Sequence, residues 1–522
     1  MTPAAPAEPK LAAEPGADGL ARVLASTWLT IGLLAAAIVQ QVIGHLDCDV
    51  SWFITFAEQY LDGKVPYVQV GDPNPPLAFL SLVPAVWIAR ALHIAVEPVV
   101  ASMVFALAAA SIALSGMVLR RGVQRSHEDW GILLNGAIFL LLIVPEIAFG
   151  EREHLALLLI APMLALMAVQ AEGAPVPAAW RLIASIGAGL AVCFKPYFIL
   201  ALALPALYVV WRKRDLRQLF GAEVWLAAAV CGIYLAVVFK FFPAYAAYAL
   251  PVITDVYAPA HDQTLNLLMY TPAPFNIALL AGFAIVAYRN FGRTGVDRLP
   301  AASVVCALAS AGFLASFFIQ GKGWINHAYP GVALSLFAWI FLALDRHPVA
   351  QAVREGRIFK FLFVPALIIA PAVCAAVVQL MNLEEHPGLR IAIQRVAPAN
   401  PKIIAMARQL DFGHPVTRQV GGTWVGRVNA LWTTSFVAQL LPTVRDPARK
   451  SRLEDYRRRD LQDFAEDVRI NRPDVVIVEN KGTREYILKR PESANVLDGY
   501  QQAASVQDIE IWTRLKSGRD SK

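Results

Sequence analysis

Long apolar segments separated by short polar loops make up most of the first 381 residues of this 522-residue chain. Helices that cross a bilayer need ~20 mostly apolar residues. The segments that approach this length lie at about 25–44, 97–119, 130–149, 154–171, 182–194, 197–211, 221–242, 265–288, 299–319, 328–344 and 359–381. Lys195-Pro196 separates two of the shorter ones, which we interpret as half-helices or tilted spans. The pattern predicts an all-α polytopic membrane module over residues 25–381.

The pattern changes at residue 382, after which no segment is apolar enough to span. Short runs of helical period alternate with short runs rich in β-branched residues. We expect helices near 399–410, 454–470 and 483–490, and strands near 419–426, 474–479 and 507–514. Alternating helices and strands predict that residues 382–522 form a soluble α/β domain.

Composition agrees with a membrane protein, because 57% of the residues are hydrophobic and only 16% are charged. Residues 1–24 are rich in Ala, Pro and Glu, and we expect them to be disordered. They lack the short apolar core of a signal peptide, so the first apolar segment is expected to remain as an anchor. The net charge is +6, but no basic segment with interleaved aromatic residues stands out in the sequence. This argues against nucleic acid as a partner.

One further apolar segment, 76–94, begins with Pro-Pro and carries Arg90 and His93. If it lies at the interface and does not span, seventeen basic residues of the membrane module fall on one side and six on the other. Basic loops favour the cytoplasm. We therefore predict eleven spans, a cytoplasmic N-terminus and an exported C-terminal domain.

Two aspartates, Asp47 and Asp49, lie just after the first span, at the start of the loop 45–96. Carboxylates at a membrane exit are costly unless they have a task. The aromatic residues Trp52, Phe53, Phe56 and Tyr60 follow at helical spacing and indicate an interfacial helix. The alternative is that Asp47 or Asp49 only caps this helix.

A second ionisable group of residues, Glu151-Arg152-Glu153-His154, stands between two apolar segments. The predicted topology places it on the same side of the membrane as Asp49. Glu151, Glu153 and His154 are therefore candidates to bind a sugar hydroxyl or to orient a base. The alternative is a solvated turn.

Basic residues on that side supply the third set of candidates. Lys195 stands alone among about thirty apolar residues, where a lysine needs a counter-charge or an exit to water. Lys322 and His327 lie in the segment 320–330 and could contact a phosphate. Trp324 and Tyr329 in the same segment could stack on a sugar. The alternatives are a snorkelling Lys195 and an aromatic-belt loop at 320–330.

These features together resemble the GT-C class of membrane glycosyltransferases, most closely the protein mannosyltransferases and the aminoarabinose transferase of lipid A. Shared with that class are an acidic motif soon after the first span, interfacial helices and a Pro-Pro-Leu segment. Here these are Asp47-Cys48-Asp49, Trp52 to Gly63 and Asn74-Pro75-Pro76-Leu77, with Leu61 to Tyr67 also matching. The motif match covers only about residues 45–80, with weaker similarity at 151–154 and 322–330.

The resemblance implies a GT-C-like fold and an inverting transfer of a sugar from a polyprenyl-phosphate donor to a lipid, glycan or protein acceptor. It further implies a bacterial inner membrane protein with residues 382–522 in the periplasm. Asp49 is the first candidate for the base that deprotonates the acceptor, with Asp47 the second. Lys195, Lys322 and His327 are the candidates for stabilising the departing lipid phosphate. We expect no obligatory metal, although two aspartates with a distant glutamate can hold Mg²⁺ or Mn²⁺.

Two other classes of function remain open from the sequence. A transporter or flippase would use the same acidic and basic groups as a path for an anionic or lipid-linked substrate. Transporters often carry a matching broken segment in each half, and only the break at Lys195-Pro196 is evident here. A non-catalytic scaffold would leave the acidic loop 45–96 unexplained.

Overall fold

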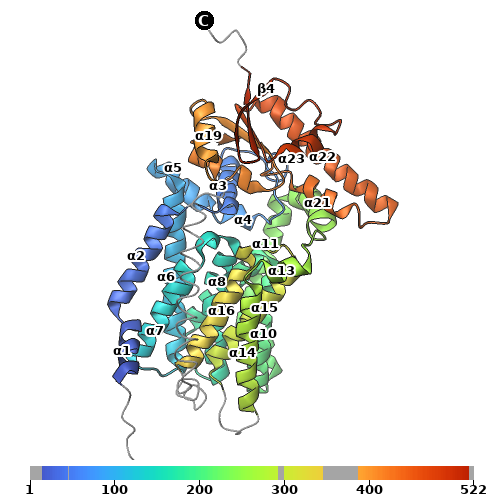
Figure 1. Ribbon diagram of the computed structural model, residues 1–522. Helices are drawn as coiled ribbons and strands as arrows, with labels where there is room; N and C mark the ends of the chain where they lie inside the picture. Colours follow the sequence, from blue (N-terminus) through green and yellow to red (C-terminus); the bar gives the residue numbers. More distant parts are fainter. Residues whose placement is uncertain (1–14, 45, 292–298, 345–385, 516–522) are drawn as a thin grey trace, which may run out of the picture.

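The computed structural model describes residues 15–44, 46–291, 299–344 and 386–515. Helices form most of the structure, and one small sheet lies in the C-terminal part. In Figure 1 the long helices run side by side in one bundle. The short helices that follow the first long helix, and then the sheet-containing domain, lie at one end of that bundle.

The helices of the bundle and its end have the following bounds. They are α1 Pro15–Leu24, α2 Thr27–Ile43, α3 Cys48–Leu61, α4 Leu77–Leu80, α5 Val83–Leu92, α6 Val96–Gly122, α7 His127–Ile138, α8 Arg152–Glu172, α9 Ala178–Phe194, α10 Leu200–Lys213, α11 Ala222–Phe241, α12 Leu250–Val252, α13 Thr264–Met269, α14 Ala273–Phe291, α15 Ala301–Gln320 and α16 Ile325–Ala343. Short π or 3-10 helices connect them: η1 Phe139–Ile143, η2 Glu146–Ala148, η3 Pro196–Ile199, η4 Leu216–Phe220, η5 Tyr245–Ala249 and η6 Ile253–Tyr257.

Within the described residues, five helical stretches are long and apolar enough to cross a membrane. They are Val96–Gly122, Arg152–Glu172, Leu216–Phe241, Ala301–Gln320 and Ile325–Ala343. The pair α2 and α3 passes the same test together but bends by 67° between them. Length and composition therefore indicate a membrane protein.

Several sequence predictions can be compared with this fold. The last predicted span, 359–381, lies outside the described residues, as does the predicted disordered segment up to residue 14. Residues Pro15–Leu24 form helix α1, so the prediction of disorder was wrong there. The segment 76–94 forms only the short helices α4 and α5, the longer of which has 10 residues. A helix of that length covers about 15 Å, half of the hydrocarbon thickness.

The C-terminal domain has a five-stranded mixed sheet in the order β2-β1-β3-β5-β4. Its elements are α19 Leu389–Val396, β1 Lys402–Met406, η8 Leu410–Phe412, α20 Val416–Gln419, β2 Thr423–Trp424, α21 Trp432–Leu440, α22 Pro447–Asn471, β3 Val475–Val478, α23 Lys481–Leu488, β4 Tyr500–Val506 and β5 Ile509–Arg514. Strand β1 pairs in parallel with β2 and β3, and β5 pairs antiparallel with β3 and β4. The predicted α/β character is confirmed.

The predicted helix near 399–410 is wrong, because this stretch contains β1. All four residues of β3 and the last four of β1 are buried, so neither strand shows the period-2 alternation that marks a half-exposed strand. Their register pairs Ile403 with Val475 and Met406 with Val478. These two strands form the centre of the domain core.

The C-terminal domain contacts the end of the bundle through α3 and α6. Arg418 Nη1 donates to Glu58 at 2.7 Å, and its Nε donates to Glu97 at 2.9 Å. His414 packs between the rings of Trp52 and Trp424, with centroid distances of 5.4 and 4.7 Å. Polar and aromatic contacts thus join the domain to α3, the helix that Asp47 caps and that contains Asp49.

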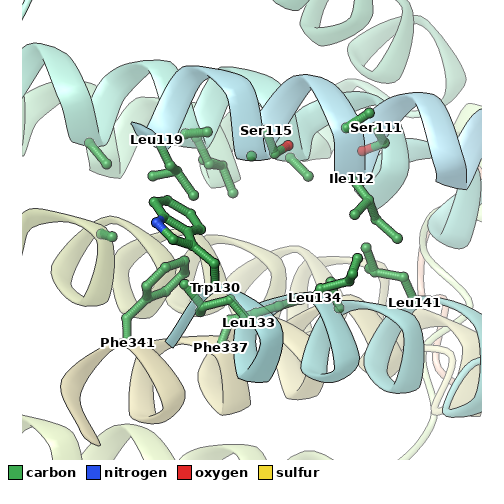
Figure 2. A pocket seen from close by; sticks show the side chains of 18 of the residues that line it. Ser111, Ile112, Ser115, Leu119, Trp130, Leu133, Leu134, Leu141, Phe337 and Phe341 are labelled. Atoms are coloured by element: carbon green, nitrogen blue, oxygen red, sulfur yellow. The ribbon is translucent and has the colours of Figure 1, made fainter. Parts of the chain in front are cut away.

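An apolar cavity of about 480 Å³ lies between α6, α7, α8 and α16. Figure 2 shows leucine, isoleucine, phenylalanine and tryptophan side chains around it, with the hydroxyls of Ser111 and Ser115 on one wall. Leu141 lines the cavity, and Arg120 and His127 are also part of its lining. Its surface suits a hydrocarbon chain.

Candidate functional site

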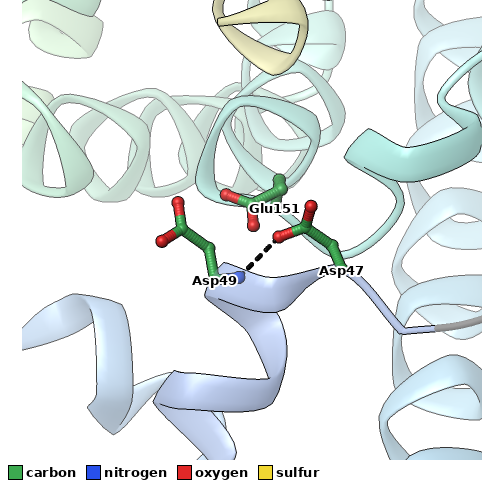
Figure 3. A group of neighbouring side chains, drawn as sticks. All are labelled: Asp47, Asp49 and Glu151. Carbon is green, nitrogen blue, oxygen red and sulfur yellow. Dashed lines mark hydrogen bonds between the residues drawn. The ribbon is translucent and has the colours of Figure 1, made fainter. Parts of the chain in front are cut away.

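The acidic pair lies at the start of α3, which Asp47 caps. The Asp47 side chain accepts a hydrogen bond from the Asp49 amide at 2.7 Å, so Asp47 does serve as an N-cap. Asp49 stands in the first turn, where a negative charge interacts favourably with the helix dipole. The two side chains project from the same end of the helix, and Figure 3 shows both close to Glu151.

Helix α8 brings the second cluster to this place. Gly150 precedes it with a φ of 83°, a left-handed conformation that glycine adopts without strain. Arg152 then begins the helix, and its side chain is only 4% exposed. Its guanidinium binds Asp49 Oδ2 and Asn74 Oδ1, and lies 3.3 Å from Glu151 Oε2. Arg152 therefore links α3, α8 and the loop before α4.

Burial dominates the electrostatics of these carboxyl groups. It raises the pKa of Asp49 to about 7, while the charge of Arg152 acts in the opposite direction. Burial also raises the pKa of Glu151 well above its usual range, and the nearby Asp47 raises it further. A base with a pKa near neutral is suited to accept a proton under physiological conditions. Asp49 keeps 15% of its side chain exposed, which leaves it accessible.

A buried ionic cluster forms around Glu153, the residue after Arg152. Lys195 Nζ donates to Glu153 Oε1 at 2.5 Å, to Gln320 Oε1 at 2.9 Å and to His327 Nε2 at 2.9 Å. An ammonium group has three donors, and all three are used here. The predicted break of the helix at Lys195-Pro196 is confirmed, because α9 ends at Phe194 and η3 begins at Pro196. This break lets the lysine reach α8 and α16.

Two polar atoms in this cluster are buried without a hydrogen-bond partner among the described residues. They are Oε2 of Glu153 and Nδ1 of His327. The two residues are 0% and 2% exposed. Buried polar atoms are nearly always satisfied. In the described structure both atoms are enclosed by protein.

The three carboxylates could also share a cation. One oxygen from each of Asp47, Asp49 and Glu151 lies within 4.8 Å of the others. Oxygen ligands of this kind suit Mg²⁺ or Mn²⁺. The guanidinium of Arg152 already binds Asp49 and approaches Glu151. The arrangement thus balances part of the negative charge with a side chain of the protein itself.

Some of the predicted residues have other roles in the structure. His154 accepts a hydrogen bond from the Gly150 amide at Nδ1 and donates from Nε2 to the Leu141 carbonyl, 2.8 Å away. The buried hydroxyl of Tyr329 donates to the Leu140 carbonyl at 2.9 Å. These contacts use the polar atoms of both side chains to hold η1 against α8 and α16. The predicted contact of His154 and Tyr329 with a substrate stays a prediction.

Lys322 makes its hydrogen bonds outside the ionic cluster. Its ammonium donates to the carbonyls of Tyr257 and Ala260 and lies over the rings of Tyr257 and Phe436, 4.2 and 4.7 Å from their centroids. These contacts join the turn between α15 and α16 to η6 and to α21 of the C-terminal domain. These contacts give Lys322 a structural role, and its predicted contact with a phosphate stays a prediction. Trp324 packs against His327, with ring centroids 5.1 Å apart, and remains 39% exposed.

Sequence reasoning missed several residues of the site. Arg152 was noted only as part of a charged turn, and Gln320 and Asn326 only as part of a loop. Asn326 Nδ2 lies 3.4 Å from Glu151 Oε2. Asp72 and Asn74 support Arg152 from the loop before α4. The sequence signal that could have indicated Asp72 and Asn74 is the short polar segment Gly71-Asp72-Pro73-Asn74, which stands directly before an apolar segment.

Comparisons with known proteins give no family for this chain. No protein-family model matches it, and no curated protein is significantly similar in sequence.

Proposed function

We propose that the chain is a membrane glycosyltransferase that moves a sugar from a polyprenyl-phosphate donor to an envelope acceptor. The observation that carries the proposal is the meeting of two clusters at one end of the helix bundle. Arg152 binds Asp49 and approaches Glu151, and the next residue, Glu153, pairs with Lys195, which also contacts His327. Carboxylates beside a basic cluster suit a reaction in which an acceptor loses a proton and a phosphate leaves.

Asp49 is the proposed general base. Its carboxylate takes the proton of the acceptor hydroxyl, whose oxygen attacks the anomeric carbon, and the bond from that carbon to the phosphate oxygen breaks. The sugar is thereby transferred with inversion, and the polyprenyl phosphate leaves with the bonding electrons. Asp47 supports the start of α3 as its cap.

Basic residues are proposed to stabilise the leaving phosphate. Charged groups and hydrogen-bond donors aimed at developing negative charge lower the barrier of a reaction strongly, because they stabilise its transition state. Lys195 and His327 lie together, and the Nδ1 atom of His327 has no partner within the described residues. His327 is thus the first candidate to contact the phosphate. Lys195, which contacts Nε2 of His327, adds its positive charge next to that histidine.

The placement of charge supports the proposed orientation. The clusters lie at the end of the bundle that carries the C-terminal domain (Figure 1). The basic ends of α6 and α10, with Arg120, Arg121, Arg212 and Lys213, lie at the other end. Basic helix ends favour the cytoplasm. We therefore propose that the site and the C-terminal domain face the periplasm of a bacterial inner membrane.

The apolar cavity supports a lipid-borne substrate. Leu141 lines this cavity, and its carbonyl accepts the hydrogen bond of His154, one residue from Glu153. A hydrocarbon chain in the cavity would therefore reach from Leu141, near the polar site, toward Arg120 at the other end of the bundle.

The experiment that tests the proposal is a comparison of envelope glycans by mass spectrometry. A strain that lacks the gene should lose one sugar from a lipid, polysaccharide or protein, and should accumulate the corresponding polyprenyl-phosphate sugar. The lost sugar and its carrier would identify substrate and acceptor together. Unchanged glycans combined with lost uptake or export of a lipid-linked substrate would favour the transporter alternative.

A further inference from the structure

The loop Gly71–Pro76 connects the C-terminal domain to the proposed base. The Gly71 amide donates to the Arg427 carbonyl at 2.6 Å, and Gly71 pairs with Val428 as an isolated parallel bridge. A Cβ atom at residue 71 would lie 3.2 Å from Val428 Cγ1, so a larger residue would disturb this contact. The domain therefore holds one end of the loop through the main chain.

Arg427 is itself fixed within the domain. Its guanidinium binds Asp463, Glu466 and Asp467 on α22 at 2.7–3.0 Å, and its amide donates to Asp467 at 2.7 Å. Several charge-assisted hydrogen bonds to one arginine fix its geometry. The position of the Gly71 partner is thus set by the longest helix of the C-terminal domain.

Asp72 organises the next part of the loop. It is 5% exposed and accepts from Trp52 Nε1 at 2.7 Å, from the Asn74 amide at 2.7 Å and from Asn74 Nδ2 at 2.8 Å. The amide of Asn74 is thereby oriented, because its Nδ2 is bound to Asp72 and its Oδ1 accepts from Arg152. Arg152 in turn binds Asp49.

We propose that Asp72 is a positioning residue, supported by the C-terminal domain, that fixes Asn74 and Arg152 and through them the carboxylate of Asp49. The kinetic part of this inference rests on the proposed function. Asp72 does not bind Asp49 itself, and the side chains of Asn74 and Arg152 connect the two carboxylates. The C-terminal domain then has a defined role, which is to hold the loop that orients the base.

Other charged groups also face Asp49 and must be distinguished from Asp72. Glu151 and Arg152 approach from α8, Asp47 from the start of α3, and Lys195 from the end of α9. Among them only Arg152 is joined to Asp72 through Asn74 in the described structure. A change at Asp72 should therefore act on Asp49 through the contact with Arg152, in addition to the direct effect of the Asp72 charge, which raises the pKa of Asp49.

The first test compares the kinetics of Asp72→Ala with those of Asp62→Asn. Asp62 belongs to the same loop region, but it is 59% exposed and pairs with Arg90 at the surface. Loss of a supporting contact typically costs roughly 10- to 100-fold in rate. Asp72→Ala should lower kcat by that factor with an unchanged KM for the donor, and Asp62→Asn should change neither. A folded Asp72→Ala protein with wild-type kcat would overturn the inference.

A second test needs no substrate and uses Asp72→Asn, which keeps the shape of the side chain. A double-mutant cycle in thermal unfolding measures the coupling between Asp49→Asn and Arg152→Gln. We expect this coupling to fall by at least half when Asp72 is replaced by Asn. Unchanged coupling would overturn the positioning role even if the enzyme is active. Reduced coupling in a protein that transfers no sugar would support the positioning role and reject the proposed function.

Discussion

Lys195 and Glu153 form a buried ion pair, in which the lysine Nζ lies 2.5 Å from the carboxylate Oε1 and the two side chains are 8% and 0% exposed. The pair joins the break after α9 to the first turn of α8. From the sequence, Lys195 stands alone among apolar residues and needs a counter-charge or an exit to water. The lysine has a counter-charge and does not need to snorkel to water.

This ion pair gives a prediction about stability. Removing one partner leaves a buried, uncompensated charge, which typically costs roughly 3–5 kcal/mol. Lys195→Met or Glu153→Gln alone should therefore lower the thermal unfolding temperature more than the double change does. The measurement is unfolding in one detergent for the four proteins. A double variant that loses the sum of both single effects would show that the two residues are not coupled.

Substitutions of Asp47 should affect mainly stability, whereas Asp49 is the residue proposed to act in the transfer reaction. Asp47→Asn keeps an oxygen that can cap α3, whereas Asp47→Ala removes the cap and should cost about 1 kcal/mol of stability. Neither change should remove more than a modest part of the transfer activity, since Asp47 is not the proposed base. Unfolding curves and turnover of both variants test this. If Asp47→Asn abolished turnover in a stable protein, the roles of the two aspartates would have to be exchanged.

The rate of transfer should depend on pH through Asp49. Burial raises the pKa of this carboxyl to about 7, and Arg152 counteracts part of that rise. A general base must be ionised, so kcat/KM should fall as the pH drops below about 7. Arg152→Gln removes the opposing charge and should move the acidic side of the pH–rate profile to higher pH. Arg152→Lys keeps the charge and should move it less. Identical pH–rate profiles for Arg152→Gln and the wild type would contradict this electrostatic account.

His414 should make the folded protein sensitive to acid. Burial, together with the charge of Arg418, lowers the pKa of His414 from 6.5 to about 3. The unfolded chain therefore binds a proton below pH 6.5 that the folded protein rejects until about pH 3. Stability is lost as the pH falls through this window, and His414→Phe should reduce that loss.

The measurement for this prediction is the free energy of unfolding as a function of pH. His93→Asn is a matched control, because His93 is exposed and Asn tolerates its positive φ of 54°. This control should keep the wild-type pH dependence. Equal acid sensitivity of His414→Phe and the wild type would mean that other groups cause the effect.

Part of the site could be predicted from sequence, because helix ends on one side of a membrane lie at one end of the bundle. This argument brought Asp49, Glu151 and Glu153 together with Lys195 and His327. It could not distinguish residues within that end. Lys322 has the correct side and charge, but it lies over Tyr257 and Phe436. Of these two aromatic partners, Phe436 comes from α21, a helix that the sequence pattern did not indicate.

The fold of the C-terminal domain shows a similar limit. Strand β3 was predicted, because Val475–Val478 is a short run of β-branched residues. Strand β1 was taken for a helix, because Ile403, Ile404 and Met406 match helical spacing as well as a fully buried strand. Strand β4 was missed, since most of Tyr500–Val506 is polar or small and its apolar alternation is weak. Pairing with β5 stabilises it, and this is not visible in the local pattern.

The central claim is that Asp49 is the base of a transfer that releases polyprenyl phosphate. Its most direct test is the release of polyprenyl phosphate by purified protein, given the donor and acceptor that the glycan comparison identifies. General base catalysis contributes typically 10²- to 10⁴-fold, so Asp49→Asn should lower release by roughly that factor while donor binding stays unchanged and Asp62→Asn remains active. Full release by a folded Asp49→Asn protein would contradict the account.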